Sequence, residues 1–373
     1  MSWKDTIVYP LIGPVLKAGL RSISRRRLPQ IQGNLHVKGL AAPVEVLRDR
    51  WGIPHIYARS ARDALFAQGF VHAQERVWQM DFTRRVVAGR LAEVLGEAAL
   101  PFDRAMRTLG LRQVAEQEAA QMPADIIFLL EAYCRGVNTW IDIATARRKL
   151  PVEFLLLGYA PEAWLPADTT SWGKLMCWTL AANWASEFMR QQIIQRLGAE
   201  KAAELEIGAE KAWGVILDAG QALGGEAGVD TRRTFTGPHA GEGVGSNNWV
   251  IHGSRTATGM PLLANDMHLE LSAPAVWFEN HLVGGELDVT GITFPGVPFV
   301  VAGHNRQVAW GYTDGMADVQ DLYEEHLRTT LSLGGRGLDG NDRGAKLACR
   351  RRAGQLRGGA GGAAARRDAH RTR

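Results

Sequence analysis

The feature that most constrains the fold is a change in the sequence near residue 216, where helical patterning stops. Residues 216–245 are rich in glycine and polar residues and have no hydrophobic period, which predicts an exposed linker of about 30 residues. Regular secondary structure does not continue across such a segment. The chain is therefore expected to have a helical front half and a separate, β-rich back half.

The front half, residues 42–215, begins with two short strand-like runs within 42–58. Ser60 and Asp63 then form a helix-cap signature, and a series of apolar residues with helical spacing follows. Helices are predicted over 60–95 (as one long helix or two consecutive ones), 111–148, 153–159 and 171–206.

Short β-branched and aromatic runs separated by turn residues follow in 246–330, and they predict strands. These runs are NNWVIHG, PLLAND, AVWFENHLVG, LDVTGITFPG, FVVAGH and VAWGYTD. Residues 331–373 lose this pattern, with ten Gly and ten Arg, and cannot bury enough apolar surface to fold. These residues could be a disordered basic tail, or they could result from a change of reading frame in the gene. The change of reading frame is favoured because the strand pattern stops abruptly.

The net charge of +4 comes from this last segment. Ten Arg and one Lys against three Asp give 331–373 a charge of +8, so the remaining residues carry −4. Nucleic-acid binding by the whole protein is therefore not expected. The three scattered cysteines, Cys134, Cys177 and Cys349, provide neither a disulfide framework nor a CxxC metal motif.

The N-terminal extension, residues 1–41, is a possible membrane anchor. The whole chain has no apolar run of 18 residues, so no transmembrane helix is expected. Pro10, Pro14 and Lys17 interrupt the apolar part of the extension, and Arg25–Arg27 follow it, whereas a secretory signal has its basic residues first. A surface anchor and an atypical signal segment are both open, and the sequence does not predict the compartment.

The stretch GEGVGSNNWVIHG, residues 241–253, places a serine where the linker becomes a strand. It could be a flexible linker, a dinucleotide-binding loop or a self-cleavage site. A dinucleotide loop needs a strand before it and a helix after it, and this order is absent here. Cleavage between Gly245 and Ser246 would create an N-terminal serine whose α-amine, with a pKa near ~8, can activate its own hydroxyl. It would also explain the long linker as a segment to be removed.

Several longer motifs occur in order along the chain. VEVLRDRWGIPHIYARSARDALFAQGFVHAQERVWQMDFTRRVVAGRLAEVLG precedes the linker. GSNNWVIHGSRTATGMPLLANDMHLELSAPAVWFE and TFPGVPFVVAGHNRQVAWGYTDGMADVQDLYEEHL follow it. Over residues 42–327 the sequence resembles the penicillin acylase (penicillin amidase) family of N-terminal nucleophile hydrolases, whose precursors are cut into α and β chains. The resemblance implies an α+β fold with αββα layering, here incomplete, because the β-chain pattern ends near residue 330.

The resemblance implies a role for individual residues. Ser246 would be the nucleophile for both self-processing and catalysis, His268 would support its amine and hydroxyl, and the backbone N–H of Asp314 would stabilise the oxyanion. A structural Ca²⁺ would be held by Glu187, Asp318, the Gln320 carbonyl and Asp321. Trp184 would line the acyl pocket. Other positions that match the family are Asn247, Trp249, Gly303, His304 and Asn305. The family's second oxyanion donor is an Asn further along the β chain, beyond the matched part.

The expected function is therefore an amidohydrolase precursor cut at Gly245–Ser246, acting on the linear amide of a small N-acyl substrate such as a β-lactam or an acyl-homoserine lactone. The resemblance implies a periplasmic or secreted location. Three alternatives stay open. The chain could be a truncated, inactive fragment, or a protein that binds its partner through the basic tail. It could also be a metal-dependent hydrolase using His268, His281, His304 and Asp266, although no two of these histidines have metal-motif spacing.

Overall fold

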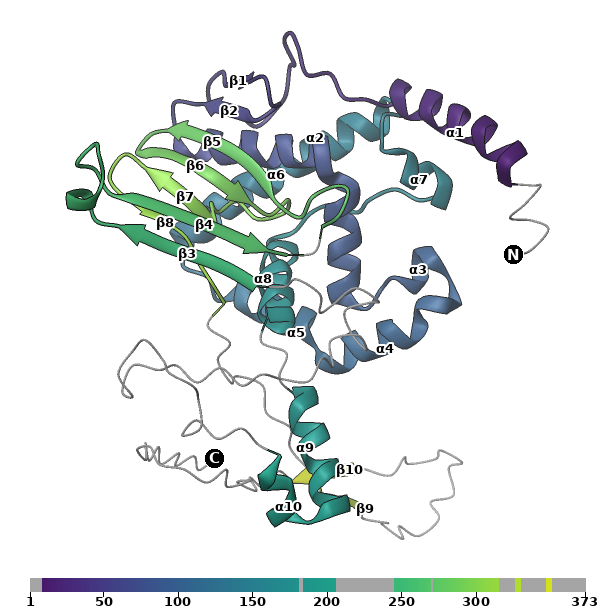
Figure 1. The fold of residues 1–373 in the computed structure, drawn as a ribbon. Helices are drawn as coiled ribbons and strands as arrows, with labels where there is room; N and C mark the ends of the chain where they lie inside the picture. The colour runs from purple at the N-terminus through teal and green to yellow at the C-terminus, as the bar shows by residue number, and fades with distance from the viewer. Residues whose placement is uncertain are drawn as a thin grey trace, which may run out of the picture. The chain divides into compact units, whose positions relative to one another are not determined.

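A computed structural model describes residues 9–180, 184–205, 245–269, 271–314, 326–329 and 347–350 (Figure 1). The chain divides into two compact units. The first unit comprises Met1–Ala182 and Val229–Ala317, and the second comprises Asn183–Gly228 and Asp318–Arg373.

The helices of the first unit follow the apolar periodicity of the sequence. They are α1 (Tyr9–Arg26), α2 (Ala61–Ala88), α3 (Ala92–Leu95), α4 (Leu100–Leu109), α5 (Leu111–Ala120), α6 (Ala124–Ala146), α7 (Val152–Leu157) and α8 (Pro166–Leu180). Each helical range predicted for this unit contains a helix, and the range 60–95 holds α2 and α3. The sequence did not predict α4. Its Pro101 lies in the first turn, where the N–H that proline lacks is not needed.

Helix α2 lies at the centre of the first unit. Ser60 caps it by accepting a hydrogen bond from the Asp63 backbone N–H, as the sequence predicts, and Gly89 ends it in a left-handed conformation. Its buried residues lie on several sides because α6 covers one side and the sheet another. The helices α2 and α6 touch at Gly136, where a Cβ atom would lie 1.9 Å from the Phe66 carbonyl oxygen.

Six strands form the larger sheet of the first unit in the order β1-β2-β5-β6-β7-β8. Their bounds are β1 (Glu45–Arg48), β2 (Pro54–Tyr57), β5 (Phe278–Gly284), β6 (Leu287–Thr293), β7 (Ala302–Asn305) and β8 (Ala309–Trp310). Neighbouring strands are antiparallel except β2 and β5, which are parallel. Both halves of the sequence therefore contribute to one sheet. In β5, Phe278, Asn280 and Leu282 are buried and alternate with more exposed residues.

A buried chain of hydrogen bonds joins the helices to this sheet. The Tyr133 hydroxyl accepts from the Gly296 N–H at 3.0 Å and lies 2.8 Å from His72 Nδ1. His72 Nε2 lies 3.2 Å from Thr293 Oγ1, and that hydroxyl donates to the Phe278 carbonyl. Because the Thr293 proton is used, its oxygen accepts from Nε2–H, which leaves His72 Nδ1 to accept from Tyr133. Burial lowers the pKa of His72 to about 3, so the imidazole is neutral.

The second unit contains α9 (Trp184–Leu197), α10 (Ala199–Glu204) and an antiparallel pair, β9 (His326–Thr329) with β10 (Leu347–Arg350). Strand β10 lies within the Gly/Arg-rich segment 331–373, and the rest of that segment lies outside the described residues. The predicted linker 216–245 also lies outside them, except for Gly245.

The expected fold class is confirmed: the chain is α+β with a largely helical first half. Besides the helices and the six-stranded sheet, the first unit has a second, small sheet, in which β3 (Gly245–Ile251) pairs with β4 (Leu262–His268). In the ranges that the structure describes, no helix is both long and apolar enough to cross a bilayer.

Candidate functional site

Ser246 lies in a two-stranded hairpin, separate from the six-stranded sheet (Figure 1). Strand β3 (Gly245–Ile251) pairs antiparallel with β4 (Leu262–His268). The connection between the strands is tight, because a Cβ atom at Gly253 would lie 2.2 Å from the Gly259 carbonyl oxygen. The hairpin therefore requires glycine at position 253, and it presents Ser246 as the second residue of β3, partly open to solvent.

The register of the hairpin decides which side chains share a face. Gly245 pairs with His268, and Ser246 pairs with Met267. Successive side chains of a strand point to opposite faces, so Ser246 and Met267 lie on one face while Asp266 and His268 lie on the other. The uncut hairpin thus brings His268 next to Gly245 rather than to the Ser246 hydroxyl. The support of Ser246 by His268 stays a prediction.

The His268 imidazole is oriented by Asp266. Its Nε2 atom lies 2.8 Å from Asp266 Oδ2 and 3.5 Å from the side-chain amide of Asn247. A carboxylate only accepts hydrogen bonds, so Nε2 carries a proton, and in the neutral imidazole Nδ1 is the nitrogen with the free lone pair. A Cβ atom at Gly245 would lie 3.7 Å from this Nδ1 atom. A potential base is therefore placed beside the residue that precedes Ser246.

Asn265 ties the hairpin to the segment that follows β8. Its Nδ2 atom donates to the carbonyls of Asn247 and Tyr312, both at 2.9 Å. Its Oδ1 atom accepts from the Tyr312 N–H at 3.0 Å. Both amide protons of Asn265 are therefore donated in hydrogen bonds. A single side chain therefore fixes the segment that leads to Asp314 against the two strands.

By the strand alternation, Asn265 lies on the same face as Ser246. Gly311 makes the contact possible, since a Cβ atom there would lie 2.7 Å from Asn265 Cβ. Asp314 follows three residues later and is exposed. Its role as an oxyanion donor stays a prediction. Sequence reasoning assigned no role to Asn265, whose signal is its place in ANDMH, one residue before Asp266.

The other predicted site residues belong to the second unit. Trp184 and Glu187 lie in α9. Asp318, Gln320 and Asp321 lie outside the described residues. The calcium site and the acyl pocket therefore stay predictions. Over the part of the chain that the structure describes, no group of three or more His, Cys, Asp or Glu side chains is arranged to hold a metal ion.

The residues of the alternative metal-dependent hydrolase do not form one cluster. His268 contacts Asp266, as described above. His281 lies in β5, with its Nδ1 atom 3.2 Å from His55 Nδ1 on the neighbouring strand, and His304 lies exposed in β7. The structure therefore gives this alternative no support.

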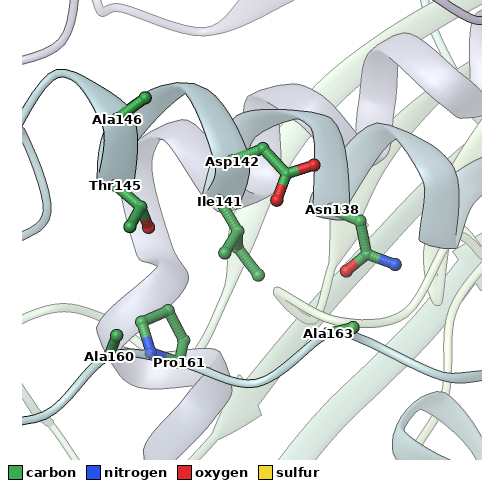
Figure 2. Close-up of a pocket in the computed structure, with 8 residues that line it drawn as sticks. All are labelled: Asn138, Ile141, Asp142, Thr145, Ala146, Ala160, Pro161 and Ala163. Carbon is green, nitrogen blue, oxygen red and sulfur yellow. The ribbon is translucent and has the colours of Figure 1, made fainter.

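A groove of about 470 Å³ lies between α6 and the loop that joins α7 to α8 (Figure 2). Figure 2 shows Ile141 of α6 pointing toward Pro161 of the loop. Asn138 holds the loop in place, because its side chain exchanges two hydrogen bonds with the Trp164 backbone, at 3.0 and 2.6 Å. No residue that lines this groove comes from the hairpin, so the groove is separate from the Ser246 site.

Comparison with known proteins gives a consistent result. The family model described as penicillin amidase matches residues 43–372. The acyl-homoserine lactone acylase QuiP of Pseudomonas aeruginosa is 39% identical over 312 residues, which cover 81% of this chain and 36% of that protein. The penicillin acylase 2 proenzyme of Pseudomonas sp. (strain SE83) is 36% identical over 327 residues, covering 82% of this chain and 41% of that protein.

A thermostable penicillin G acylase from Alcaligenes faecalis is 27% identical to the chain, with a TM-score of 0.41 over 50% of this chain and 98% of that one. The chain spans about two fifths of the length of the two curated relatives described above. The family model covers most of the chain, including the strands on both sides of the linker and the hairpin that carries Ser246. The chain belongs to the penicillin amidase family.

Proposed function

We propose that the protein is an amidohydrolase, made as one precursor that cuts itself between Gly245 and Ser246. The observation that carries the proposal is the position of His268, whose Nδ1 atom lies beside Gly245 at the first pair of the β3–β4 ladder. The curated relative named as a proenzyme supports the same processing.

In the self-cleavage, Ser246 Oγ attacks the Gly245 carbonyl carbon and forms a tetrahedral centre. The C–N bond then breaks, the Ser246 nitrogen takes the proton that the hydroxyl has lost, and an ester links Gly245 to Ser246 Oγ. Water hydrolyses this ester, leaving one chain that ends at Gly245 and another that begins at the Ser246 amine. This amine forms on the Gly245 side of Ser246, where His268 Nδ1 can accept a hydrogen bond from it.

In the catalytic cycle, the free α-amine takes the proton of the Ser246 hydroxyl as the oxygen attacks the acyl carbonyl of the substrate. The substrate nitrogen takes this proton and leaves as the amine, and water releases the acid from the acyl–Ser246 ester. The Asp314 N–H donates to the oxyanion, and Asn265 positions its segment. The relatives are named for penicillin and acyl-homoserine lactones, so we propose an N-acyl compound of one of these classes as the substrate. Glu187, Asp318, Gln320 and Asp321 would hold a structural calcium, which prefers such oxygen donors.

A matched pair of serine variants tests the cleavage. Ser246→Ala removes the proposed nucleophile, whereas Ser254→Ala removes a serine of the same hairpin that also follows a glycine. Ser254 Oγ lies 2.9 Å from His252 Nδ1, so the control also contacts an imidazole. Intact-mass analysis is expected to find fragments divided at Gly245–Ser246 in the wild type and in Ser254→Ala, and one uncut chain in Ser246→Ala. Division of Ser246→Ala at the same bond would refute the proposal.

The substrate class is tested on the purified wild type and the two serine variants, with mass spectrometry of the released acid. Penicillin G and a series of acyl-homoserine lactones of increasing acyl length serve as substrates. Release of acid by the wild type and by Ser254→Ala, but not by Ser246→Ala, is the expected result. Release of acid by a chain in which residue 246 is still internal would contradict the proposed mechanism.

A further inference from the structure

The helix α1 has two chemically distinct faces. At 100° per residue, Val15, Leu16, Leu20 and Ile23 fall within an arc of about 140° around the helix axis. Lys17, Arg21 and Arg25 occupy the opposite side, with a centre about 170° from that of the apolar arc. Arg26, the last residue of the helix, is the one basic residue of α1 that falls on the apolar side. This separation of apolar and basic residues is typical of helices that lie in the surface of a membrane.

The apolar face of α1 is not covered by the rest of the first unit. Val15 and Leu16 are 71% and 59% exposed, and Leu20 and Ile23 are 39% and 40% exposed. The helix is held at its C-terminal end, where Arg27 donates to the Leu150 carbonyl at 2.8 Å. Four apolar side chains therefore face solvent on a helix that is fixed to the protein near one end (purple in Figure 1).

The charge around α1 indicates what covers this face. Residues 9–44 contain six Lys and Arg and no Asp or Glu, while residues 1–330 as a whole carry −4. An anionic bilayer complements both parts of the helix, because its phosphates attract the basic residues and its acyl boundary takes the apolar side chains. A spanning helix is not an alternative for α1, since no helix of the described ranges is apolar enough to cross a bilayer.

We propose that α1 binds the protein to the surface of a membrane rich in anionic phospholipid. The helix lies in the plane of the interface, with its apolar face among the acyl chains and its Lys and Arg side chains at the headgroups. Binding of this kind needs both contributions, because a few apolar side chains or a few basic ones give only weak attachment alone. The proposal does not depend on cleavage at Ser246.

Flotation of the full chain with lipid vesicles tests the proposal. Vesicles of phosphatidylcholine alone are compared with vesicles containing about a third phosphatidylglycerol, at low and high salt. The bound fraction is expected to be at least tenfold larger with the anionic vesicles, and to fall as salt is raised. Equal binding to both kinds of vesicle, or binding that salt does not change, would overturn the electrostatic part of the proposal.

Variants then test the apolar part. Leu16→Glu combined with Leu20→Glu is expected to lower binding to the anionic vesicles at least tenfold. Leu95→Glu serves as the matched control, because Leu95 is 47% exposed on α3, and it is expected to bind like the wild type. Wild-type binding by the double variant would overturn the proposal. The oligomeric state is also measured without lipid. If the wild type is a dimer and the double variant is a monomer, a second copy of the chain covers the apolar face, and this result would also overturn the proposal.

Discussion

Acidification from pH 8 to pH 5 is expected to lower the free energy of unfolding by about 2 kcal/mol through one side chain, His72. His72 is fully buried, and its burial, followed by the positive charge of Arg76, lowers its pKa to about 3. In the unfolded chain the pKa of histidine is about 6.5. The hydrogen bonds give a structural reason for the neutral form: a proton on Nδ1 would meet the Tyr133 hydroxyl, which would then need a new acceptor for its own proton.

The sign follows from the lowered pKa of the folded state. Between pH 6.5 and pH 3 the unfolded chain binds a proton that the folded chain does not bind. The contribution of His72 to stability is therefore fully present above about pH 6.5 and falls as the pH drops toward 3. At pH 5, ~1.5 units below the unfolded pKa, the loss at 1.36 kcal/mol per unit is about 2 kcal/mol.

Urea unfolding followed by Trp fluorescence at pH 8 and pH 5 measures this loss. His72→Gln is the test variant, because its amide can donate to Thr293 and accept from Tyr133 without titrating. His36→Gln changes an exposed histidine and is the matched control. The wild type and His36→Gln are expected to lose about 2 kcal/mol more than His72→Gln on acidification. An equal loss in all three proteins would refute the assignment to His72.

Three further substitutions test other contacts. Tyr133→Phe leaves the buried Gly296 N–H without its acceptor and is expected to lower the free energy of unfolding by about 2 kcal/mol in urea titrations, whereas an unchanged midpoint would contradict the network. Gly136→Ala places a methyl group against the α2 backbone and should lower the free energy of unfolding by ~1–3 kcal/mol. An unchanged free energy of unfolding would exclude the close crossing of α2 and α6. Asn265→Ala is expected to slow cleavage at Ser246 about tenfold in intact-mass time courses, since each ~1.4 kcal/mol lost at the site is a factor of ten. Asn248 pairs with Asn265 across the two strands, and Asn248→Ala is the control that should cleave at the wild-type rate. Equal cleavage rates in the two variants would contradict the proposal that Asn265 positions the site.

The sequence predicted those parts of the fold that depend on neighbouring residues. The cap of α2 is one example, because Ser60 and Asp63 make their contact within one helical turn. The parallel pairing of β2 with β5 could not be predicted in this way, since the paired residues His55 and His281 are 226 positions apart. A local sequence pattern does not indicate which strands, far apart in the sequence, pair with each other.

The same limit applies to the candidate site. The change of linker into strand, which is a local feature, drew attention to Ser246, and the family resemblance implied its role as the nucleophile. The face on which each side chain lies depends on the register of β3 against β4, and a slip of one residue would exchange the faces. The position of Asn265 depends on Tyr312, 47 residues away. The sequence and its family resemblance therefore proposed the residues of the candidate site, whereas their relative placement required the structure.

The hairpin contains two Gly–Ser pairs, and their surroundings differ in a way that favours cleavage at the first. By distance to an imidazole alone, Ser254 would be selected, with its Oγ atom 2.9 Å from His252 Nδ1. However, Gly253 is buried in the tight connection between the strands. A cut there would disrupt that turn and divide β3 and β4 between two chains. A cut before Ser246 removes only the first pair of the ladder and leaves Ser246, Asn265 and His268 within one chain. Self-cleavage that must leave a working site behind therefore favours the serine at the start of the strand over the serine with the shorter contact to a histidine.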